Sequence, residues 1–507
     1  MIEEKNNRAF EGQERDSMEL LNSTAKNSIE LLPAHIIHNI LFEGGLGPID
    51  LASLEATCYM FRAAAGFEPC RFKSIAELAA RHSCHRQPLF LRMPRHARLQ
   101  LLARCDGNWK LVLRFLQALE QASQGGVATS TSHKTVQMVA GKYHSLIVDR
   151  NGKLYACGSG LHGILGQGPN IKCCQLPTRI ALPNLPGLQI KQISGSHNHA
   201  AFITQAGEVY TFGDNSSCCC GIGDVGQMIT QPTLVDSLTG IYCQEVVTGL
   251  SYTVVMTREG KLYSWGSGSH GQLGHGNTQD EYRPLQIEAI DESINPVVQV
   301  SAGVSHTLAV TKDGALYTFG YGANSGLGHG EFVSEPSPRR VRYFTDQEVF
   351  LVSAVAGDEH SAAIDSIGQV YTWGKGYCGA LGHGDESDQS FPQLVVGLNS
   401  VRAVQVSARR RKTFVLTDSG TVFAFGWMAF GSLGVKDRGY SEKVVHPQSL
   451  DEAVSGQKIA RMSAGQYHTL ALSTKGSLLG FGDNEKWQLA NAHNLQSGEE
   501  VFTEIPH

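Results

Sequence analysis

Seven copies of one glycine-punctuated phrase fill the last three-quarters of this 507-residue chain and constrain its fold more than any other feature. One copy reads Ala-Gly-x-x-His at 302–306 and continues as Gly-x-Leu-Tyr-x-Phe-Gly at 314–320. The histidine position recurs, at spacings of 52 to 56 residues, as His144, His199, Tyr252, His306, His360, Lys412 and His468. A repeat this regular indicates stacked copies of one structural unit, an architecture that usually binds other molecules rather than catalysing reactions.

Each copy has the pattern of short β-strands joined by tight turns. The runs Leu-Tyr-Ser-Trp-Gly (262–266) and Val-Tyr-Thr-Trp-Gly (370–374) are rich in β-prone residues and end at a turn former. Turn signals precede such runs, for example Asn-Gly at 151–152 and Asp-Gly at 313–314. One such sheet cannot bury both of its faces, whereas several sheets stacked radially around an axis can. The pattern therefore predicts a mainly β fold, a propeller of seven blades.

The repeated phrase resembles the regulator-of-chromosome-condensation repeat, and the resemblance covers residues 134–507. Members of that family form seven-bladed propellers, so the resemblance implies one here. The repeat is also longer than Trp–Asp repeats of about 40–45 residues and kelch repeats of about 50. The ultraviolet-B photoreceptor branch of this family carries tryptophan in a Gly-Trp-Arg-His phrase. The matching slots here hold no tryptophan, so we expect a relative that is distinct from the light-sensing branch.

The first 133 residues have a different composition and are expected to form separate parts. Residues 1–28 are polar and of mixed charge, which predicts a disordered tail. Residues 69–122 continue as a helical extension, and the Ser/Gly-rich stretch 123–133 reads as a flexible linker. Between them, residues 29–68 show a helix start at Pro33 followed by an apolar helical stripe.

The phrase Leu-Pro-x-x-Ile-Ile-x-x-Ile-Leu within 29–68 is similar to an F-box, here combined with the repeats in a plant-type arrangement. This resemblance implies docking on the Skp-type adaptor of a cullin ubiquitin ligase. The residues that would bind the adaptor are Leu32, Pro33, Ile36, Ile37, Ile40 and Leu41. The alternative is a plain helical cap packed on the propeller.

Charge and composition argue against several functions. Residues 1–132 carry a net charge of +1 and the remainder −6, whereas nucleic-acid binders concentrate positive charge. No apolar run approaches the ~20 residues of a membrane span, and no secretory signal is visible. Twelve cysteines without regular spacing favour reduced thiols in the cytoplasm or nucleus. We therefore expect neither a membrane nor a nucleic-acid partner.

Motifs that would indicate an enzyme are missing from the sequence: the phosphate loop, the nucleophile elbow and His-Glu-x-x-His. We therefore expect no enzyme, no catalytic residue, no cofactor and no metal.

Two groups of cysteines leave a second reading open. Cys218, Cys219 and Cys220 fall in a lengthened loop of the second copy, and Cys173 and Cys174 lie in the matching segment of the first. Neighbouring loops of this kind would suit a soft metal or a redox sensor. Structural thiols are the alternative, because no Cys-x-x-Cys pair occurs.

The residues most informative about partners are the two variable positions between the glycine and the histidine of each copy. They lie on the turn into a strand, so seven pairs should form a ring on one face of the propeller. These pairs, which we call the turn ring, are Lys142/Tyr143, His197/Asn198, Leu250/Ser251, Val304/Ser305, Asp358/Glu359, Arg410/Arg411 and Gln466/Tyr467.

The sixth copy departs most from the repeat, since Arg409 and Lys412 replace the usual Gly and His. Its basic residues should adjoin the acidic pair of the fifth copy. We therefore predict partner contacts at Tyr143, Asp358, Glu359, Arg409, Arg410, Arg411, Lys412 and Tyr467. A local variation of the fold is the alternative for residues 409–412.

These expectations combine into a non-enzymatic scaffold. The preferred hypothesis is a substrate receptor of a Skp–cullin–F-box ubiquitin ligase, with a protein substrate on the propeller face. A guanine-nucleotide exchange factor or other regulator of a small GTPase is the alternative. A scaffold without any link to ubiquitin is a third hypothesis.

Overall fold

The computed structural model describes residues 75–123, 136–182, 188–223, 226–291, 293–323, 326–435, 443–451, 454, 456–490 and 503–504. The chain forms two compact units, which divide between Gln117 and Ala118. The predicted tail (1–28) and F-box-like motif (29–68) lie outside the described residues, as does nearly all of the predicted linker (123–133).

The first unit is helical, as the sequence of 69–122 predicts. Its described helices are α5 (Ile75–Cys84), α6 (Pro88–Arg92), α7 (Arg95–Arg104) and α8 (Trp109–Ser123), the last of which crosses the unit boundary. Asn108 accepts hydrogen bonds from the backbone N–H groups of the first turn of α8, as an N-cap residue does. Phe90 is buried and its ring meets that of Trp109 edge-on at 6.0 Å.

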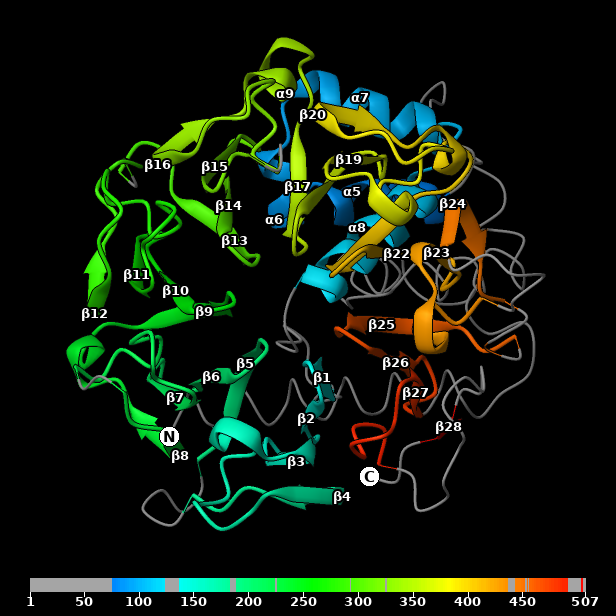
Figure 1. The fold of residues 1–507 in the computed structure, drawn as a ribbon. Helices are drawn as coiled ribbons and strands as arrows, with labels where there is room; N and C mark the ends of the chain where they lie inside the picture. Colours follow the sequence, from blue (N-terminus) through cyan, green and yellow to red (C-terminus); the bar gives the residue numbers. More distant parts are fainter. Residues whose placement is uncertain are drawn as a thin grey trace, which may run out of the picture. The chain divides into compact units, whose positions relative to one another are not determined.

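The second unit contains seven four-stranded antiparallel sheets, the blades of a propeller (Figure 1). The first four blades consist of β1 (Gln137–Ala140), β2 (His144–Val148), β3 (Leu154–Ser159) and β4 (Cys173–Arg179); β5 (Ile190–Gly195), β6 (His199–Thr204), β7 (Val209–Gly213) and β8 (Ile229–Leu234); β9 (Cys243–Thr248), β10 (Tyr252–Thr257), β11 (Leu262–Gly266) and β12 (Glu281–Gln286); and β13 (Val297–Ala302), β14 (His306–Thr311), β15 (Leu316–Gly320) and β16 (Glu335–Arg340).

The remaining three blades follow the same order, and a short helix, α9 (Arg342–Asp346), precedes them. They consist of β17 (Leu351–Ala356), β18 (His360–Asp365), β19 (Val370–Gly374) and β20 (Gln389–Leu394); β21 (Ala403–Arg409), β22 (Lys412–Thr417), β23 (Val422–Trp427) and β24 (Lys443–Ser449); and β25 (Ile459–Ala464), β26 (His468–Ser473), β27 (Leu478–Gly482) and β28 (Thr503–Glu504). The predicted mainly β, seven-bladed propeller is confirmed.

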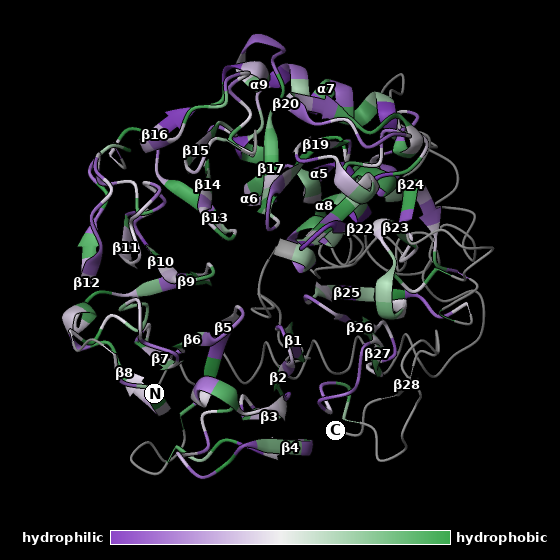
Figure 2. Ribbon diagram, in the orientation of Figure 1, coloured by the Kyte–Doolittle hydropathy of each residue, from purple (hydrophilic) through white to green (hydrophobic). Residues whose placement is uncertain are grey.

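Each blade is built from four consecutive strands, and the first strand lies nearest the propeller axis (Figure 1). Inner strands of neighbouring blades contact one another, including β1 with β25, so the ring is closed. Burial follows this order: the second strands are buried along their whole length, for example β14 and β18. Figure 2 shows the contrast between the apolar inner strands β13 and β17 and the polar outer strand β16.

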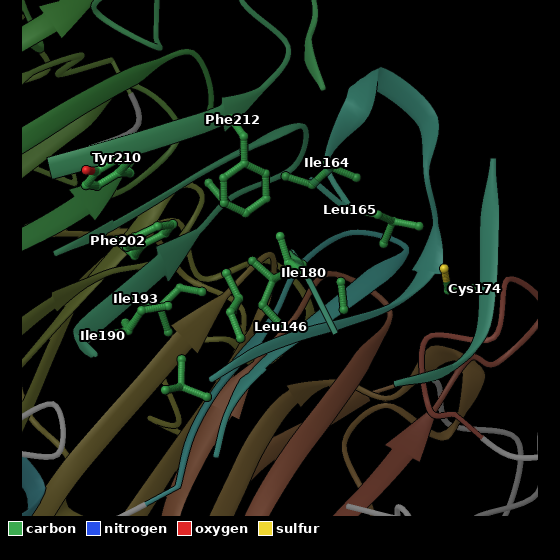
Figure 3. Packing of buried hydrophobic residues seen from close by; sticks show 14 residues of the cluster. Leu146, Ile164, Leu165, Cys174, Ile180, Ile190, Ile193, Phe202, Tyr210 and Phe212 are labelled. Atoms are coloured by element: carbon green, nitrogen blue, oxygen red, sulfur yellow. The ribbon is translucent and has the colours of Figure 1, made fainter. Parts of the chain in front are cut away.

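Apolar side chains fill the space between blades. Between the first two blades, Ile164, Leu165 and Ile180 pack toward Phe202 and Phe212 (Figure 3). The cluster comprises fourteen buried residues from both blades. At about 25 cal/mol per Å² of apolar surface, such burial is the main force that holds the sheets together. None of the described helices is long and apolar enough to cross a membrane.

Candidate partner-binding face

The turn ring forms where the first strand of each blade turns into the second. Side chains of one inner strand bond the backbone of the next, as Gln299 does with the backbone of Ala354. The inner strands therefore run in one direction, and all seven turns lie at one end of the propeller. The side chains of the turn ring are half-buried, with the exception of His197, which is buried at 8% exposure.

The third strand of each blade holds the turn in place. The backbone N–H that follows its final glycine donates to the carbonyl of the second ring residue, as in Ser159 to Tyr143 (2.8 Å). That glycine has a positive φ in every blade, 102° at Gly158. A Cβ there would lie 2.4 Å from the Tyr143 carbonyl oxygen, so glycine is required by both its conformation and the close approach. The repeated glycines therefore fix the ring's backbone and leave its side chains free to vary.

The repeated histidines form a buried layer beneath the ring. His199 bonds the hydroxyl of Thr253 in the next blade (3.0 Å), and His306 bonds Ser361 in the same way (3.0 Å). The bonds from His360 to Thr413 and from His468 to Ser145 complete the pattern at 2.8 Å each. The hydroxyl itself donates to a carbonyl of the preceding blade, so the imidazole Nε2–H is the donor. We call each such contact between blades a latch.

Two blades use another residue type for the latch. Tyr252 donates through its hydroxyl to the His306 carbonyl (2.6 Å) and accepts from Thr307. Lys412 is fully buried, and its Nζ lies 3.3 Å from the carbonyls of Ser432 and His468 and from the Thr469 hydroxyl. Burial lowers the pKa of Lys412 well below its usual range.

The burial of Lys412 corrects its place among the predicted partner contacts. Its side chain extends into the latch layer rather than onto the surface, because the first position of every second strand points inward. Arg409, Arg410 and Arg411 therefore carry the basic charge of this turn. A tight two-residue turn joins Arg409 to Lys412, and Arg410 has a φ of 52°, the left-handed conformation that such hairpins need.

A strip of stacked cations and aromatic rings crosses four neighbouring blades of the ring. The Arg410 guanidinium lies 4.0 Å from the ring centroid of Trp427 and 4.6 Å from that of Tyr467. Tyr467 also stacks on Tyr143 of the first blade (5.1 Å, 15°). The strip continues with Lys142 over Tyr143, Arg411 over Tyr377 of the fifth blade, and Phe430 edge-on to Tyr467. Cation–π contacts of this kind contribute about 0.5–2 kcal/mol each.

Arg409 and Asp358 bring the basic and acidic sectors together, as the sequence predicts for adjoining turns. Arg409 Nε lies 3.5 Å from Asp358 Oδ1, and both side chains are largely buried. The charges of both residues act on His197 of the second blade: Arg409 lowers its pKa and Asp358 raises it. Burial, followed by the positive charge of Arg409, lowers the pKa of His197 to about 4, so this imidazole is neutral at pH 7.

The cysteine-rich loop has a structural explanation. Cys219 presents its carbonyl to the indole N–H of Trp265 (2.8 Å) and to the Thr253 hydroxyl (2.9 Å). Its thiol donates to the Asp214 carbonyl, and the neighbouring Cys220 thiol and burial raise the pKa of Cys219 well above its usual value. In the described part of the chain, no group of three or more His, Cys, Asp or Glu residues is arranged to hold a metal ion.

Sequence reasoning missed three residues of this face: Trp427, Phe430 and Tyr377. They lie on the third strand or the loop after it, not in the Gly-x-x-His phrase. The repeat phrase gave no signal for them, because only the fold brings Trp427 to the turn, where its N–H donates to the Arg411 carbonyl (2.8 Å). The predicted contacts Tyr143, Asp358, Glu359, Arg409, Arg410, Arg411 and Tyr467 do lie on one side of the ring, in blades five, six, seven and one.

A closed ring of seven blades with buried inter-blade latches and variable turns defines a class of propellers built from one repeat. The family model of the regulator of chromosome condensation (RCC1) repeat matches residues 151–203, 206–256, 259–310, 313–364, 368–416 and 419–472. The chain therefore belongs to the RCC1 repeat family, whose propellers serve as protein-interaction scaffolds or regulators.

Individual relatives differ in how much of their length is shared. The chain is 32% identical over 362 residues to the ultraviolet-B receptor UVR8 of Arabidopsis thaliana, which covers 71% of this chain and 80% of UVR8. It is 29% identical over 349 residues to the human E3 ubiquitin-protein ligase HERC2, covering 68% of this chain but only 7% of HERC2.

Among solved structures, Prp20p of Saccharomyces cerevisiae superimposes with a TM-score of 0.62 at 18% identity, covering 72% of this chain and 88% of Prp20p. Human WBSCR16 gives 0.60 at 21% identity, covering 69% and 89%. At these identities the likeness concerns the fold alone.

Proposed function

We propose that this protein is a non-enzymatic scaffold that binds a protein substrate on its turn ring and presents it to a Skp–cullin ubiquitin ligase through the F-box-like segment 29–68. The observation that carries the first half is the concentration of arginine and aromatic side chains on one sector of the ring. Arginine, tyrosine and tryptophan are the residues that dominate the energetics of protein interfaces. The latch layer beneath them is buried and joins the blades, so we assign it a scaffold role.

The second half of the proposal rests on the helical apolar stripe of the F-box-like phrase. In it, Leu32, Pro33, Ile36, Ile37, Ile40 and Leu41 bind the adaptor. A ubiquitin ligase among the relatives, HERC2, is consistent with this role. The ten described cysteines are all free thiols, as expected of a protein that works in the reducing cytoplasm or nucleus.

Co-purification with a Skp-type adaptor tests this proposal. We expect the full chain to retain the adaptor, and Ile36→Asp with Ile40→Asp to abolish retention, because two charges would enter an apolar contact. Ile2→Asp with Met18→Asp, in the predicted tail, adds the same charge and should change nothing. Failure of the unmodified chain to bind any Skp-type adaptor would rule out the ligase role.

Regulation of a small GTPase is the second candidate, favoured by the fold shared with Prp20p, a protein described with binding properties to Gsp1p and histones. In this case the same ring would contact the GTPase. Nucleotide release measured over a panel of small GTPases tests the exchange reaction. Acceleration of one member by the full chain would support it, and unchanged rates across the panel would remove it.

A further inference from the structure

Arg410 is held in an unusual way for a surface arginine. The central carbon of its guanidinium lies 4.0 Å from the ring centroid of Trp427 and 4.6 Å from that of Tyr467. Two rings therefore hold the guanidinium in place, and its Nη1 has no hydrogen-bond partner. A fixed guanidinium matches a planar oxyanion in a bidentate pair, and little side-chain entropy remains to be lost on binding.

The charges around Arg410 are not balanced by the protein. Arg410, Arg411 and Lys142 each lie over an aromatic ring, and no carboxylate of the described chain lies within ion-pair distance of them. Asp358 is engaged by Arg409 instead. The sector therefore retains a positive charge, although the unit that carries it is acidic.

Buried polar atoms without a hydrogen-bond partner gather at the same place. They are His197 Nδ1, Asp358 Oδ1, Arg409 Nε, Arg410 Nη1 and Gln466 Oε1. His197 and Arg409 are more than nine-tenths buried, at 8% and 9% exposure. Arg409 Nε and Asp358 Oδ1 face each other at 3.5 Å, which leaves three atoms, on turns of the second, sixth and seventh blades. A buried polar atom left unpaired costs about 1–3 kcal/mol, so these three point to a group that pairs with them. The three offer a cationic donor on Arg410 beside a neutral imidazole nitrogen and an amide oxygen, which suits a carboxylate next to a peptide N–H.

We infer that the turn ring binds an acidic segment of its protein partner, with one carboxylate on the Arg410 guanidinium and a neighbouring peptide N–H on Gln466 Oε1. This inference rests on the proposal that the ring binds a protein, and it names the chemistry of that protein. Arg409 and Lys142 add attraction, whereas Asp358 opposes a second negative charge. Discrimination therefore depends on the fixed position of one arginine rather than on net charge.

The inference is tested with the full chain and a fluorescent hexaglutamate peptide, followed by anisotropy. We expect saturable binding that weakens at least about tenfold in Arg410→Lys, because an ammonium keeps the charge and loses the planar fork. Arg283→Lys is the matched control on the outer strand of the third blade, where Arg283 pairs with Asp236 at 3.0 Å, and it should bind like the unmodified chain. Asp358→Asn should bind about threefold more tightly, because a repelling charge is removed.

The opposite results are equally definite. Equal losses in Arg410→Lys and Arg283→Lys, or no loss in either, would show attraction by charge alone and overturn the inference. Weaker binding by Asp358→Asn, tighter binding of hexalysine, or a tenfold preference for a phosphoserine peptide would also overturn it. Adaptor co-purification on the same samples separates the two proposals: a chain that retains the adaptor and ignores the acidic peptide loses only this inference.

Discussion

The junction between blades six and seven and the junction between blades one and two are held in different ways. At the first, Lys412 bonds two carbonyls and a hydroxyl, and Gln405 pairs with both backbone groups of Met462. At the second, His144 Nε2 is buried without a partner, because Ala200 stands where the other blades have Ser or Thr. Gln137 makes bonds there like those of Gln405, with the Lys191 carbonyl and the Ile193 N–H, so only the latch is missing. Apolar packing around Phe202 and Phe212 takes its place (Figure 3). A latch is therefore a replaceable contribution to each junction.

The largest expected effect is the loss of the polar junction through Lys412→Ala. The truncation leaves a cavity and removes a donor from two carbonyls and a hydroxyl, so we expect a loss of about 3 kcal/mol in the free energy of unfolding. Denaturant unfolding measures it. Lys412→His, which restores the common residue of the repeat, is the control and should lose much less. Equal stability of the two variants would show that the lysine's hydrogen bonds contribute nothing.

The second prediction concerns Glu245, which lies on the inner strand β9 of the third blade. It occupies the repeat position that Gln405 occupies on β21 of the sixth blade. Glu245 accepts from the Val300 N–H (3.2 Å), whereas glutamine at this position both accepts and donates. Burial raises the pKa of Glu245 from 4.5 to about 7. Its contribution to stability is therefore complete below pH 4.5 and is lost as the pH rises through 7.

We expect Glu245→Gln to be more stable than the unmodified chain at pH 8, by about 2 kcal/mol after allowance for partial exposure. The difference should shrink steadily toward pH 4.5. Thermal unfolding between pH 4.5 and 8 measures it, with Glu208→Gln, on another strand end, as the control. A difference independent of pH would show that Glu245 does not titrate in this range.

The smallest effect should come from supplying the missing latch with Ala200→Ser. A hydroxyl there can accept from His144 Nε2 and donate to the preceding blade, as Ser145 does with the Gln488 carbonyl (2.7 Å), so we expect a gain of about 1 kcal/mol. Ala201→Ser is the control. Its neighbour's partner, the unpaired His144 Nε2, belongs to the junction of blades one and two, whereas Ala201 packs in the apolar cluster of the next junction, so this hydroxyl should destabilise. If Ala200→Ser also destabilises, the junction between blades one and two has no room for a polar contact.

The repeat spacing was sufficient to predict the seven blades, because each copy carries its own strands, turns and glycines. It also placed the turn ring on one face. Lys412 was misjudged because charge was given more weight than position: the first residue of every second strand points inward, whatever its type. The stacking of Arg410 on Trp427 lay beyond sequence reasoning, since Arg410 lies on the turn after β21 and Trp427 at the end of β23. The pairing of β22 with β23 brings the two residues together. The F-box-like segment remains a prediction.

The closure of the ring has a consequence for how the chain reaches its native state. Every blade pairs strands that are consecutive in the chain, so each can form from local contacts soon after its residues are synthesised. The bonds that join the last blade to the first, from Ala140 to Ser463 and from Ser145 to His468, span 323 residues. Contacts between residues so distant in sequence form slowly, because the loop entropy must be lost before they contribute. We therefore expect a late, rate-limiting closure step after a rapid accumulation of paired blades.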